Sequence, residues 1–516
     1  MKILTASQMR EVDRLTTELG IPGLVLMENA GHRVAEFLAA EFAPVSGHRV
    51  VILCGKGNNG GDGLVIARQL HTRLHPADLH VALACPPEDL KGDALANYRM
   101  LRACGCTVVP EITPAMRMAT VIVDAVLGTG LRGPAIGRAL AWIREINTGF
   151  PLAKIVAVDV PSGLASDSAE SPGETVRADY TVTFTAPKIG QVIGPNSARV
   201  GRLIVSPIGS PPELYEQDAA VLLSLIERRW IAPLLAPRVP WSHKGDFGHV
   251  LVIAGSKGKT GAAAMSGLSA LRGGAGLVTV ASPESALATI AAHAAELMTE
   301  PLPETAAGAV ALRSFDDGRL SKLVAGKDVI AIGPGLGTNP ETVNVVRRAV
   351  EEFQQPMVID ADGLNALAGT DFQARGRLRV LTPHPGEMAR LAGTSTAAIQ
   401  DDRVAAARNF ACSRGVVLVL KGYRTLIAFP DGRVWVNDTG TPAMATGGSG
   451  DILTGLIAAF LAQFPETPDL AVSAAVHLHG LSGELGAARL GEKPLIATDL
   501  LKFLPAAIDA CLPHRD

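Results

Sequence analysis

The chain has 516 residues, which is long for a single globular domain, so we expect two domains. Its 47 lysines and arginines against 50 aspartates and glutamates give a formal net charge of −3, which excludes the basic excess that nucleic acid or an anionic membrane would require. A hydrophobic fraction of 47% excludes a disordered chain. No apolar run reaches the ~18 residues of a transmembrane helix, residues 1–10 lack the apolar stretch of a signal peptide, and six cysteines are too few for a disulfide framework, so we expect a cytoplasmic protein.

The first half of the chain alternates β-branched runs with Ala- and Leu-rich stretches of helical length, after a first helix expected at residues 6–19. The runs are apolar almost throughout, which is typical of strands buried on both faces. This alternation predicts a mostly parallel sheet with helices on both sides. The strands are expected at residues 49–54, 79–85, 107–110, 120–127, 154–160 and 180–185.

The alternation breaks after residue 207. Ser210-Pro211-Pro212 and three prolines at positions 233, 237 and 240 flank a segment, 219–230, that we expect to be a short helix. We therefore place a first domain at residues 1–212, a linker region at 213–240 and a second domain at 225–510.

The second half restarts the same pattern and adds one new feature. Residues 425–429 and 433–437, joined by Pro430-Asp431-Gly432, predict a β-hairpin. The sequence thus predicts two α/β domains in tandem. The strands before the hairpin are expected at residues 249–254, 277–281, 329–332, 357–360, 380–382 and 416–420.

Glycines and polar residues gather where strands of the first half end, which is the edge at which open α/β sheets bind ligands. Gly55, Gly57 and Gly60 fit G-x-G-x-x-G before a helix expected at residues 64–70. The signal is weak, because Gly128, Gly130 and Gly133 show the same spacing and no acidic residue ends the second strand. Such glycine-lined backbone still suits a phosphate or pyrophosphate group. Other strand ends carry Asp124, Asp159 and Lys188.

The motifs 58–63, Asp124 with 128–134, and 159–163 together resemble the NAD(P)H-hydrate epimerase domain over most of residues 1–210. The resemblance implies a Rossmann-like three-layer fold that interconverts the R and S forms of hydrated NADH and NADPH. It implies a potassium ion held by Asn59, Asp124 and Ser162, and Asp159 as the catalytic acid/base with Lys188 as an accessory. It also implies these contacts with the hydrated nucleotide: Asn58, Asn59, Gly60, Gly61, Asp62, Gly128, Thr129, Gly130, Leu131, Arg132, Gly133, Pro134 and Asp159.

The second half carries a stronger anion-binding signal at Thr446-Gly447-Gly448-Ser449-Gly450-Asp451, which precedes a helix expected at residues 452–461. Small residues leave backbone N–H groups open to an anion, and the helix dipole adds to the attraction. Asp451 then lies near a transferring phosphate. Gly258-Lys259-Thr260 is not a Walker A motif, because Ile253 stands where that motif needs glycine. Asp360 and Glu387 could approach magnesium through water.

Gly448–Asp451 and His384–Glu387 resemble motifs of the ribokinase-like superfamily. With 243–245, 333–337 and Lys421-Gly422, residues 225–510 resemble its NAD(P)H-hydrate dehydratase branch. The resemblance implies a ribokinase-like α/β fold, a magnesium ion, and phosphorylation of the S hydrate by ADP or ATP before loss of phosphate. It implies Asp451 as the catalytic residue and Ala262, Gly335, His384 and Asp451 as contacts of the hydrate. The residues that would line the nucleotide are Lys421, Gly422, Tyr423, Arg424, Thr425 and Gly450.

Together the two resemblances predict a bifunctional repair enzyme with small-molecule substrates, no nucleic-acid or membrane partner, and a homo-oligomeric assembly. One alternative is a vitamin or sugar kinase with a non-catalytic N-terminal binding module. His384, where such kinases carry asparagine, counts against a kinase. The complete set of Asn59, Asp124, Asp159 and Ser162 counts against a non-catalytic module.

Overall fold

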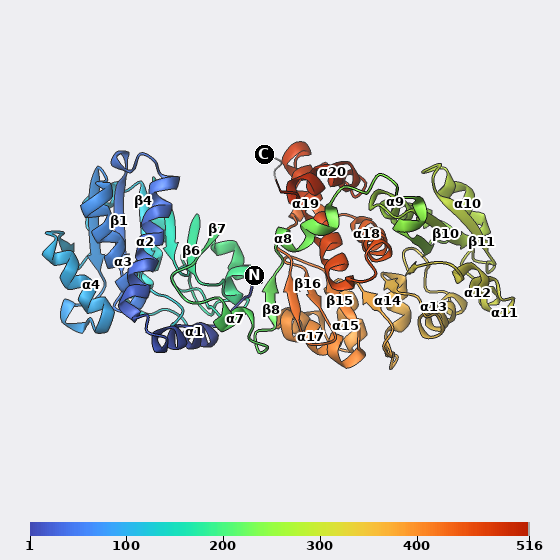
Figure 1. The fold of residues 1–516 in the computed structure, drawn as a ribbon, viewed down its shortest axis with the longest axis horizontal. Coiled ribbons are helices and arrows are strands. Elements are labelled where there is room, and N and C mark those ends of the chain that lie inside the picture. The colour runs from blue at the N-terminus through green and yellow to red at the C-terminus, as the bar shows by residue number, and fades with distance from the viewer. Residues whose placement is uncertain (514–516) are drawn as a thin grey trace. The chain divides into compact units, whose positions relative to one another are not determined.

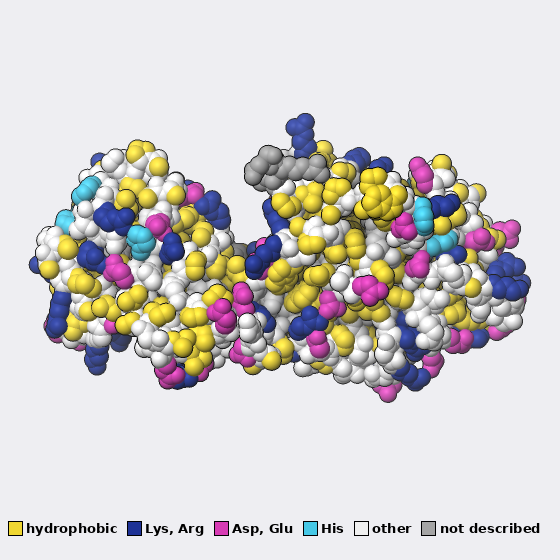
Figure 2. Space-filling view, viewed as in Figure 1, with side chains coloured by type: hydrophobic (Ala, Val, Ile, Leu, Met, Phe, Trp, Pro, Cys, Tyr) yellow, Lys and Arg dark blue, Asp and Glu magenta, His cyan; other side chains and the backbone are white. Residues whose placement is uncertain are grey.

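The computed structural model describes residues 1–513, and the chain divides into two compact units between Leu223 and Ser224. Each unit is a layered α/β structure built on its own sheet (Figure 1). Within the described residues, no helix is both long enough and apolar enough to cross a lipid bilayer. Figure 2 shows basic and acidic side chains interspersed over both units on the face in view, as the near-zero net charge predicts.

The N-terminal unit contains a seven-stranded, all-parallel sheet in the order β3-β2-β1-β4-β5-β6-β7, which confirms the predicted α/β class. Its strands are β1 (Arg49–Cys54), β2 (Asp78–Leu83), β3 (Val108–Val109), β4 (Val121–Ala125), β5 (Lys154–Val158), β6 (Tyr180–Phe184) and β7 (Arg202–Ser206). Its helices are α1 (Ala6–Glu18), α2 (Gly23–Glu41), α3 (Asn58–Gln69), α4 (Gly92–Ala103), α5 (Gly137–Thr148), α6 (Ile189–Val192) and α7 (Glu213–Glu216).

Both faces of this sheet are covered, which explains the apolar runs. Alternate side chains of β1 enter different cores: Ile52 packs with α2, α3 and α4, whereas Leu53 packs with α5. A strand buried on both sides needs apolar residues at every position. The strand order changes direction between β1 and β4, so their carboxyl ends flank the crevice where such sheets bind ligands.

The C-terminal unit contains a ten-stranded sheet in the order β11-β10-β9-β12-β13-β14-β15-β16-β17-β8. It is parallel as far as β15, and the predicted hairpin forms the antiparallel pair β16–β17. Its strands are β8 (Leu223–Leu225), β9 (His249–Ile253), β10 (Leu277–Pro283), β11 (Met298–Leu302), β12 (Val329–Ile332), β13 (Met357–Ile359), β14 (Arg379–Leu381), β15 (Val417–Leu420), β16 (Leu426–Ala428) and β17 (Val434–Val436).

Helices pack on both faces of this sheet (Figure 1). They are α8 (Arg228–Ile231), α9 (Thr260–Arg272), α10 (Glu284–Ala291), α11 (Arg313–Asp316), α12 (Arg319–Val324), α13 (Pro340–Glu352), α14 (Asp362–Leu367), α15 (Pro385–Ala392), α16 (Thr396–Asp401), α17 (Arg403–Arg414), α18 (Ser449–Gln463), α19 (Pro468–Leu490) and α20 (Asp499–Cys511).

Three predicted elements differ in the structure, and one strand was not predicted. The segment 219–230 is not one helix, because it supplies strand β8, and Ile226 N–H bonds to Val436 O beside that strand. Strand β11 was not predicted, since Pro301 makes its sequence unlike a strand and only a sheet edge tolerates that residue. Helices α3 and α18 begin at Asn58 and Ser449, so both glycine-rich motifs form first helical turns rather than preceding loops.

We propose that the two units fold independently, and the structure refines where the N-terminal unit ends. Val221 is buried in a small core with Leu4 and Met9, onto which Tyr215 also packs. A fragment of residues 1–212 lacks these contacts, whereas a fragment of residues 1–222 keeps them. Because burying one valine stabilises by about 1.5–3 kcal/mol, we expect the shorter fragment to unfold roughly 3–12 °C lower in a thermal melt. Equal midpoints would contradict this, and two unfolded halves would contradict independent folding.

Candidate active sites

The N-terminal unit has a cavity of about 600 Å³ at the carboxyl ends of its central strands. Nine of the thirteen residues predicted to contact the hydrated nucleotide line it, as does Lys188: Asn58, Asn59, Asp62, Gly128, Thr129, Gly130, Leu131, Arg132 and Asp159. The other four predicted contacts do not line it: Gly60, Gly61, Gly133 and Pro134. Gly60 is required by packing, because a Cβ there would lie 1.8 Å from Gly55 O. A Cβ on Gly61 would lie 2.6 Å from Met27 Sδ.

Asp159 follows β5 and is held by a buried lysine. Lys188 Nζ donates to Asp159 Oδ1 at 2.6 Å and to Thr183 Oγ1 at 2.8 Å, and Thr183 Oγ1 donates to Asp159 Oδ1 at 2.9 Å. Lys188 has 1% of its surface exposed, so its charge depends on this carboxylate. The backbone of Asp159 has a φ of 61°, a strained conformation that marks functional positions. The residue is therefore fixed at the cavity wall by its side chain and its neighbours together.

The three residues predicted to hold potassium lie together beside this cavity. Ser162 N–H and Asp124 Oδ2 are 2.8 Å apart, and Ser162 Oγ also donates to Asp124. Burial raises the pKa of Asp124 to about 6, although these Ser162 hydrogen bonds lower it. Asn59 Nδ2 donates to Leu127 O at 2.9 Å, while Asn59 Oδ1 is buried without a hydrogen-bond partner. An orphaned amide oxygen beside a carboxylate and a hydroxyl fits a monovalent cation that prefers oxygen ligands.

Sequence patterns missed the contribution of α1 to this cavity. Met9, Asp13 and Thr17 all line it. The sequence does hold one indication of this contribution. The spacing of four residues places Asp13 on the same helix face as Met9, which is buried in the core.

The C-terminal unit has a cavity of about 570 Å³ whose wall includes all six residues predicted for the nucleotide and His384. His384 is the N-cap of α15, and its Nδ1 accepts from Gly386 N–H at 3.0 Å. In a neutral imidazole Nε2 then carries the hydrogen. His479, which sequence patterns missed, also lines the cavity, and burial lowers its pKa to about 4.

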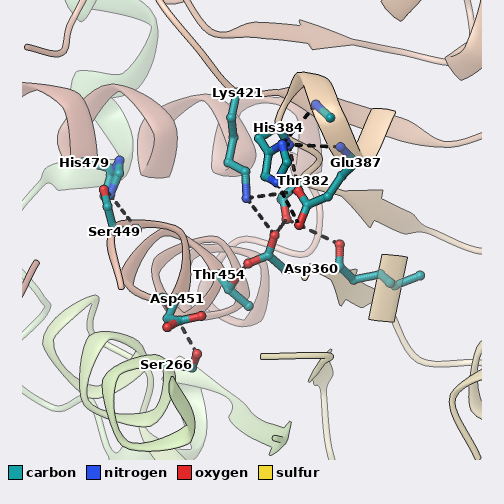
Figure 3. Close-up of polar contacts among 12 residues, drawn as sticks. Ser266, Asp360, Thr382, His384, Glu387, Lys421, Ser449, Asp451, Thr454 and His479 are labelled. Carbon is teal, nitrogen blue, oxygen red and sulfur yellow. Dashed lines mark hydrogen bonds and ion pairs between the residues drawn. The ribbon is translucent and has the colours of Figure 1, made fainter. Parts of the chain in front are cut away.

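Lys421 connects this cavity to a buried acidic group (Figure 3). Its Nζ lies 2.8 Å from Asp360 Oδ1 and 3.8 Å from Glu387 Oε2. Burial alone would lower the pKa of Lys421, but the Asp360 and Glu387 carboxylates outweigh burial and raise it. Gly450 lies close to this ammonium group, since a Cβ at its position would be 3.2 Å from Lys421 Nζ. The two carboxylates therefore favour the charged form of the ammonium group beside the first turn of α18.

Asp451 lies in the first turn of α18, where the helix dipole favours a negative charge. Burial raises the pKa of Asp451 to about 6, Asp360 adds to the shift and Lys421 opposes it. Ser266 of α9 donates to Asp451 O at 3.1 Å, which fixes this turn against α9 (Figure 3). Ala262 lies on the same helix, and a Cβ on Gly335 would lie 3.1 Å from its Cβ. Of the four residues predicted for the hydrate, His384 alone lines the C-terminal cavity.

The carboxylates predicted for magnesium are occupied by protein donors. Asp360 has 2% of its surface exposed and accepts from Thr382 Oγ1 at 2.7 Å, from Lys421 Nζ, and from Thr454 Oγ1 at 3.0 Å. Glu387 accepts from His384 N–H at 2.8 Å. Residues 1–513 contain no group of three or more His, Cys, Asp or Glu side chains placed to hold a metal ion. These carboxylates do not fit direct magnesium ligands.

A buried arginine supports the loop that lines the C-terminal cavity. Arg403, with 7% of its surface exposed, donates to the carbonyl oxygens of Leu420, Lys421 and Tyr423. A Cβ on Gly422 would lie 3.0 Å from its Nη2. Burial lowers the pKa of Arg403 to about 10, so it remains charged at neutral pH. Sequence patterns missed Arg403, since nothing local marks it as different from a surface arginine.

Known proteins match both halves of the chain. The family model "NAD(P)H-hydrate dehydratase" matches residues 250–506, and "YjeF-related protein N-terminus" matches residues 23–190. The bifunctional NAD(P)H-hydrate repair enzyme Nnr of Moorella thermoacetica is 44% identical over 98% of this chain and 96% of its own length. The Escherichia coli protein of the same name is 36% identical over 95% of this chain and 90% of its own.

A solved structure matches the C-terminal unit. It is the ADP/ATP-dependent NAD(P)H-hydrate dehydratase of Bacillus subtilis, co-crystallised with ATP and Mg²⁺. It is 34% identical, with a TM-score of 0.50, and the match covers 56% of this chain and 98% of that one. This confirms the predicted ribokinase-like class of the unit. Since the match to the repair enzymes runs through both units, the chain belongs to the family of bifunctional NAD(P)H-hydrate repair enzymes.

Proposed function

We propose that the N-terminal unit interconverts the R and S forms of hydrated NADH and NADPH and that the C-terminal unit dehydrates the S form at the expense of ADP or ATP. The observation that carries this proposal is that each unit gathers its predicted reactive carboxylate, Asp159 or Asp451, at or beside a cavity lined by its predicted binding residues. Because epimerisation supplies the form that dehydration consumes, one chain recovers both forms. The relatives named above support this pairing over a vitamin or sugar kinase.

In the N-terminal unit, Asp159 is the acid/base for the hydroxyl-bearing ring carbon, and Lys188 keeps its carboxylate in place. Asn59, Asp124 and Ser162 would hold a potassium ion, which would supply a positive charge beside the cavity that contains Asp159. Asn58, Gly128–Leu131 and Arg132 line the cavity that would take the rest of the nucleotide. Contacts from Gly60, Gly61, Gly133 and Pro134 stay a prediction.

In the C-terminal unit, Asp451 accepts the proton of the hydrate hydroxyl as its oxygen attacks the terminal phosphorus of ADP or ATP. The phosphoanhydride bond breaks, and the first turn of α18 stabilises the charge on the transferring group through its N–H groups. Phosphate then leaves with the electron pair of its bond to carbon, a proton leaves the neighbouring carbon, and the ring double bond returns. The Bacillus subtilis relative was crystallised with Mg²⁺ and ATP, and we propose that magnesium enters this chain with the nucleotide phosphates.

Two further predictions concern the whole protein. We propose a cytoplasmic location and a homo-oligomeric assembly, with small molecules as the substrates of both units. The two proposed reactions do not depend on either prediction, because each reaction uses residues of one unit only.

The proposed function is tested by supplying the purified protein with an equilibrated mixture of hydrated NADH epimers, magnesium, and ADP or ATP. We expect the dihydronicotinamide absorbance to return for the entire pool, because the epimerase replenishes the S form. Replacing potassium by tetramethylammonium should slow recovery of the R form alone, since the larger ion cannot occupy the Asn59–Asp124–Ser162 site. Absorbance that never returns with either nucleotide would contradict the proposal.

Asp159→Asn tests the epimerase chemistry. Asparagine tolerates the positive φ at this position and can still accept from Lys188, but it cannot carry the proton. We expect epimerisation to slow by roughly a hundredfold or more, while dehydration of the S form stays at its wild-type rate. Chromatographic separation of the epimers measures the first rate. Asp78→Asn, an exposed acid on β2, is the matched control, and wild-type epimerisation by Asp159→Asn would contradict the assignment.

Asp451→Asn tests the phosphoryl-transfer chemistry. Asparagine keeps the shape and cannot accept the proton, so we expect nearly normal nucleotide binding in calorimetry and a loss of dehydration on the order of a thousandfold. Epimerisation should continue, leaving both forms in equilibrium with no NADH returned. Because a base works only when ionised, wild-type dehydration should fall as the pH falls through about 6. NADH regeneration near the normal rate in the variant would contradict the mechanism.

A further inference from the structure

Helix α1 brings an acidic side chain to the N-terminal cavity that neither the sequence motifs nor the similar proteins assign. Asp13 lies between Met9 and Thr17 on one helix face, and all three line the cavity that also contains Asp159. The family model for this half begins at residue 23, after the end of α1. Asp13 therefore lies at the same cavity as Asp159, and no role in the reaction has yet been assigned to it.

One carboxyl oxygen of Asp13 has no partner. Oδ1 is buried and makes no hydrogen bond with the described residues. An ionised carboxylate in this position loses water without gaining a donor, which favours the protonated form. Burial raises the pKa of Asp13 to about 6, with Lys188 opposing the shift and Asp159 adding to it.

The single buried cation of this group is already committed to Asp159. An ammonium group has three N–H donors, and Lys188 directs them to Asp159 Oδ1, Thr183 Oγ1 and, at 3.2 Å, Phe184 O. Asp62 gains no such donor either, and burial, Asp159 and Asp13 together raise its pKa well above the usual range. The cavity therefore holds one ion pair and two carboxyl groups that favour a proton.

Inversion at the hydroxyl-bearing carbon requires two proton transfers, one on each face of the ring. The oxygen must leave one face of the ring as water, which requires an acid, and a second water must enter from the other face, which requires a base. Two carboxyl groups can act as this acid and this base when their environments give them different pKa values. Asp159, whose Oδ1 accepts hydrogen bonds from Lys188 Nζ and Thr183 Oγ1, supplies the base.

We propose that Asp13 is a second acid–base residue of the epimerase and acts with Asp159, an inference that rests on the proposed epimerase function. Asp13 gives its proton to the hydroxyl oxygen, and the carbon–oxygen bond breaks with its electron pair leaving on water. The ring nitrogen stabilises the resulting cation. A water oxygen then bonds to the opposite face and gives a proton to Asp159. The composition of the substrate is unchanged, and the proton lost by Asp13 equals the one gained by Asp159. Asp159 then releases its proton to water and Asp13 takes one from water, which restores both groups for the next turnover.

Other charged groups face the same cavity and contribute to its titration. These are Arg10 on α1, Lys56 before α3, Asp62 on α3, Asp93 on α4, Arg132 after β4, and the Asp159–Lys188 pair. A change in the rate at a single pH would not distinguish the titration of Asp13 from the titration of these groups. The pH profile of an Asp13 variant does so, because only that profile loses the titration of Asp13 itself.

The test uses the full-length protein and isolated R-form hydrated NADH without nucleotide, so that the dehydratase is idle. Appearance of the S form is followed by chromatography between pH 5 and 9, after subtraction of the enzyme-free rate. We expect wild-type kcat/KM to fall as the pH rises through about 6, because the acid must carry its proton. Asp13→Asn should lower kcat by roughly a hundredfold with little change in KM, and its profile should lack that falling limb. Asp13→Glu should keep the limb and part of the rate.

Glu11→Gln is the matched control, since it removes an exposed carboxylate from the same helix and should leave rate and profile unchanged. Wild-type kcat in Asp13→Asn, or a falling limb that persists there, would overturn the proposal. If the variant does not fold, a wild-type profile without a falling limb near pH 6 overturns it. If Asp159→Asn also retained the wild-type rate, the proposed epimerase site itself would be wrong, so the two failures are distinguishable.

Discussion

In both units one buried ammonium group faces more carboxyl groups than it can neutralise. Lys188 is bonded to Asp159, while Asp13 and Asp62 share the same cavity without a cation of their own. Lys421 is bonded to Asp360 and lies near Glu387, and Asp451 belongs to the same electrostatic group. Low solvent access makes each charge costly unless it is paired, so the carboxyl group without the lysine is pushed toward its protonated form. The two sheets thus share one electrostatic arrangement, which raises the pKa of Asp13 and of Asp451, the groups proposed for proton transfer, to about 6.

The parallel sheets bring these groups together. Residues that follow successive parallel strands meet at one edge, however far apart they lie in the sequence. Asp124 ends β4, Asp159 follows β5 and Lys188 follows β6 in the N-terminal unit; Asp360 follows β13 and Lys421 follows β15 in the other. In both units the edge is completed by a helix that starts with glycines and small residues, α3 or α18. Their small side chains let the helix start approach strand ends that larger residues would push away.

Much of this organisation could be predicted from local sequence. The features that could not be predicted share one cause, which is that they depend on tertiary contacts. Apolar runs predicted the buried strands, and the residues Pro430-Asp431-Gly432 predicted the turn of the β16–β17 hairpin. Strand β8 could not be predicted, because its pairing with β17 joins residues about two hundred positions apart and overrides local propensity. Asp13 and Arg403 were missed for a related reason: their roles depend on what tertiary packing places around them. A polar residue on an amphipathic helix looks the same in sequence whether its neighbour is water or a reactive carboxylate.

Arg403 shows what such packing can do to a loop. In a trans peptide the N–H points opposite to the C=O, and Arg403 draws the carbonyl oxygens of Lys421 and Tyr423 toward itself. The N–H groups of Gly422 and Arg424 consequently point away from the guanidinium, so these peptide dipoles turn their positive ends outward. Arg403 therefore orients the peptide dipoles of a loop that lines the C-terminal cavity, although it is itself absent from the cavity wall. The anion binding that we propose for this loop would thus be favoured by a cation that the anion itself would not contact.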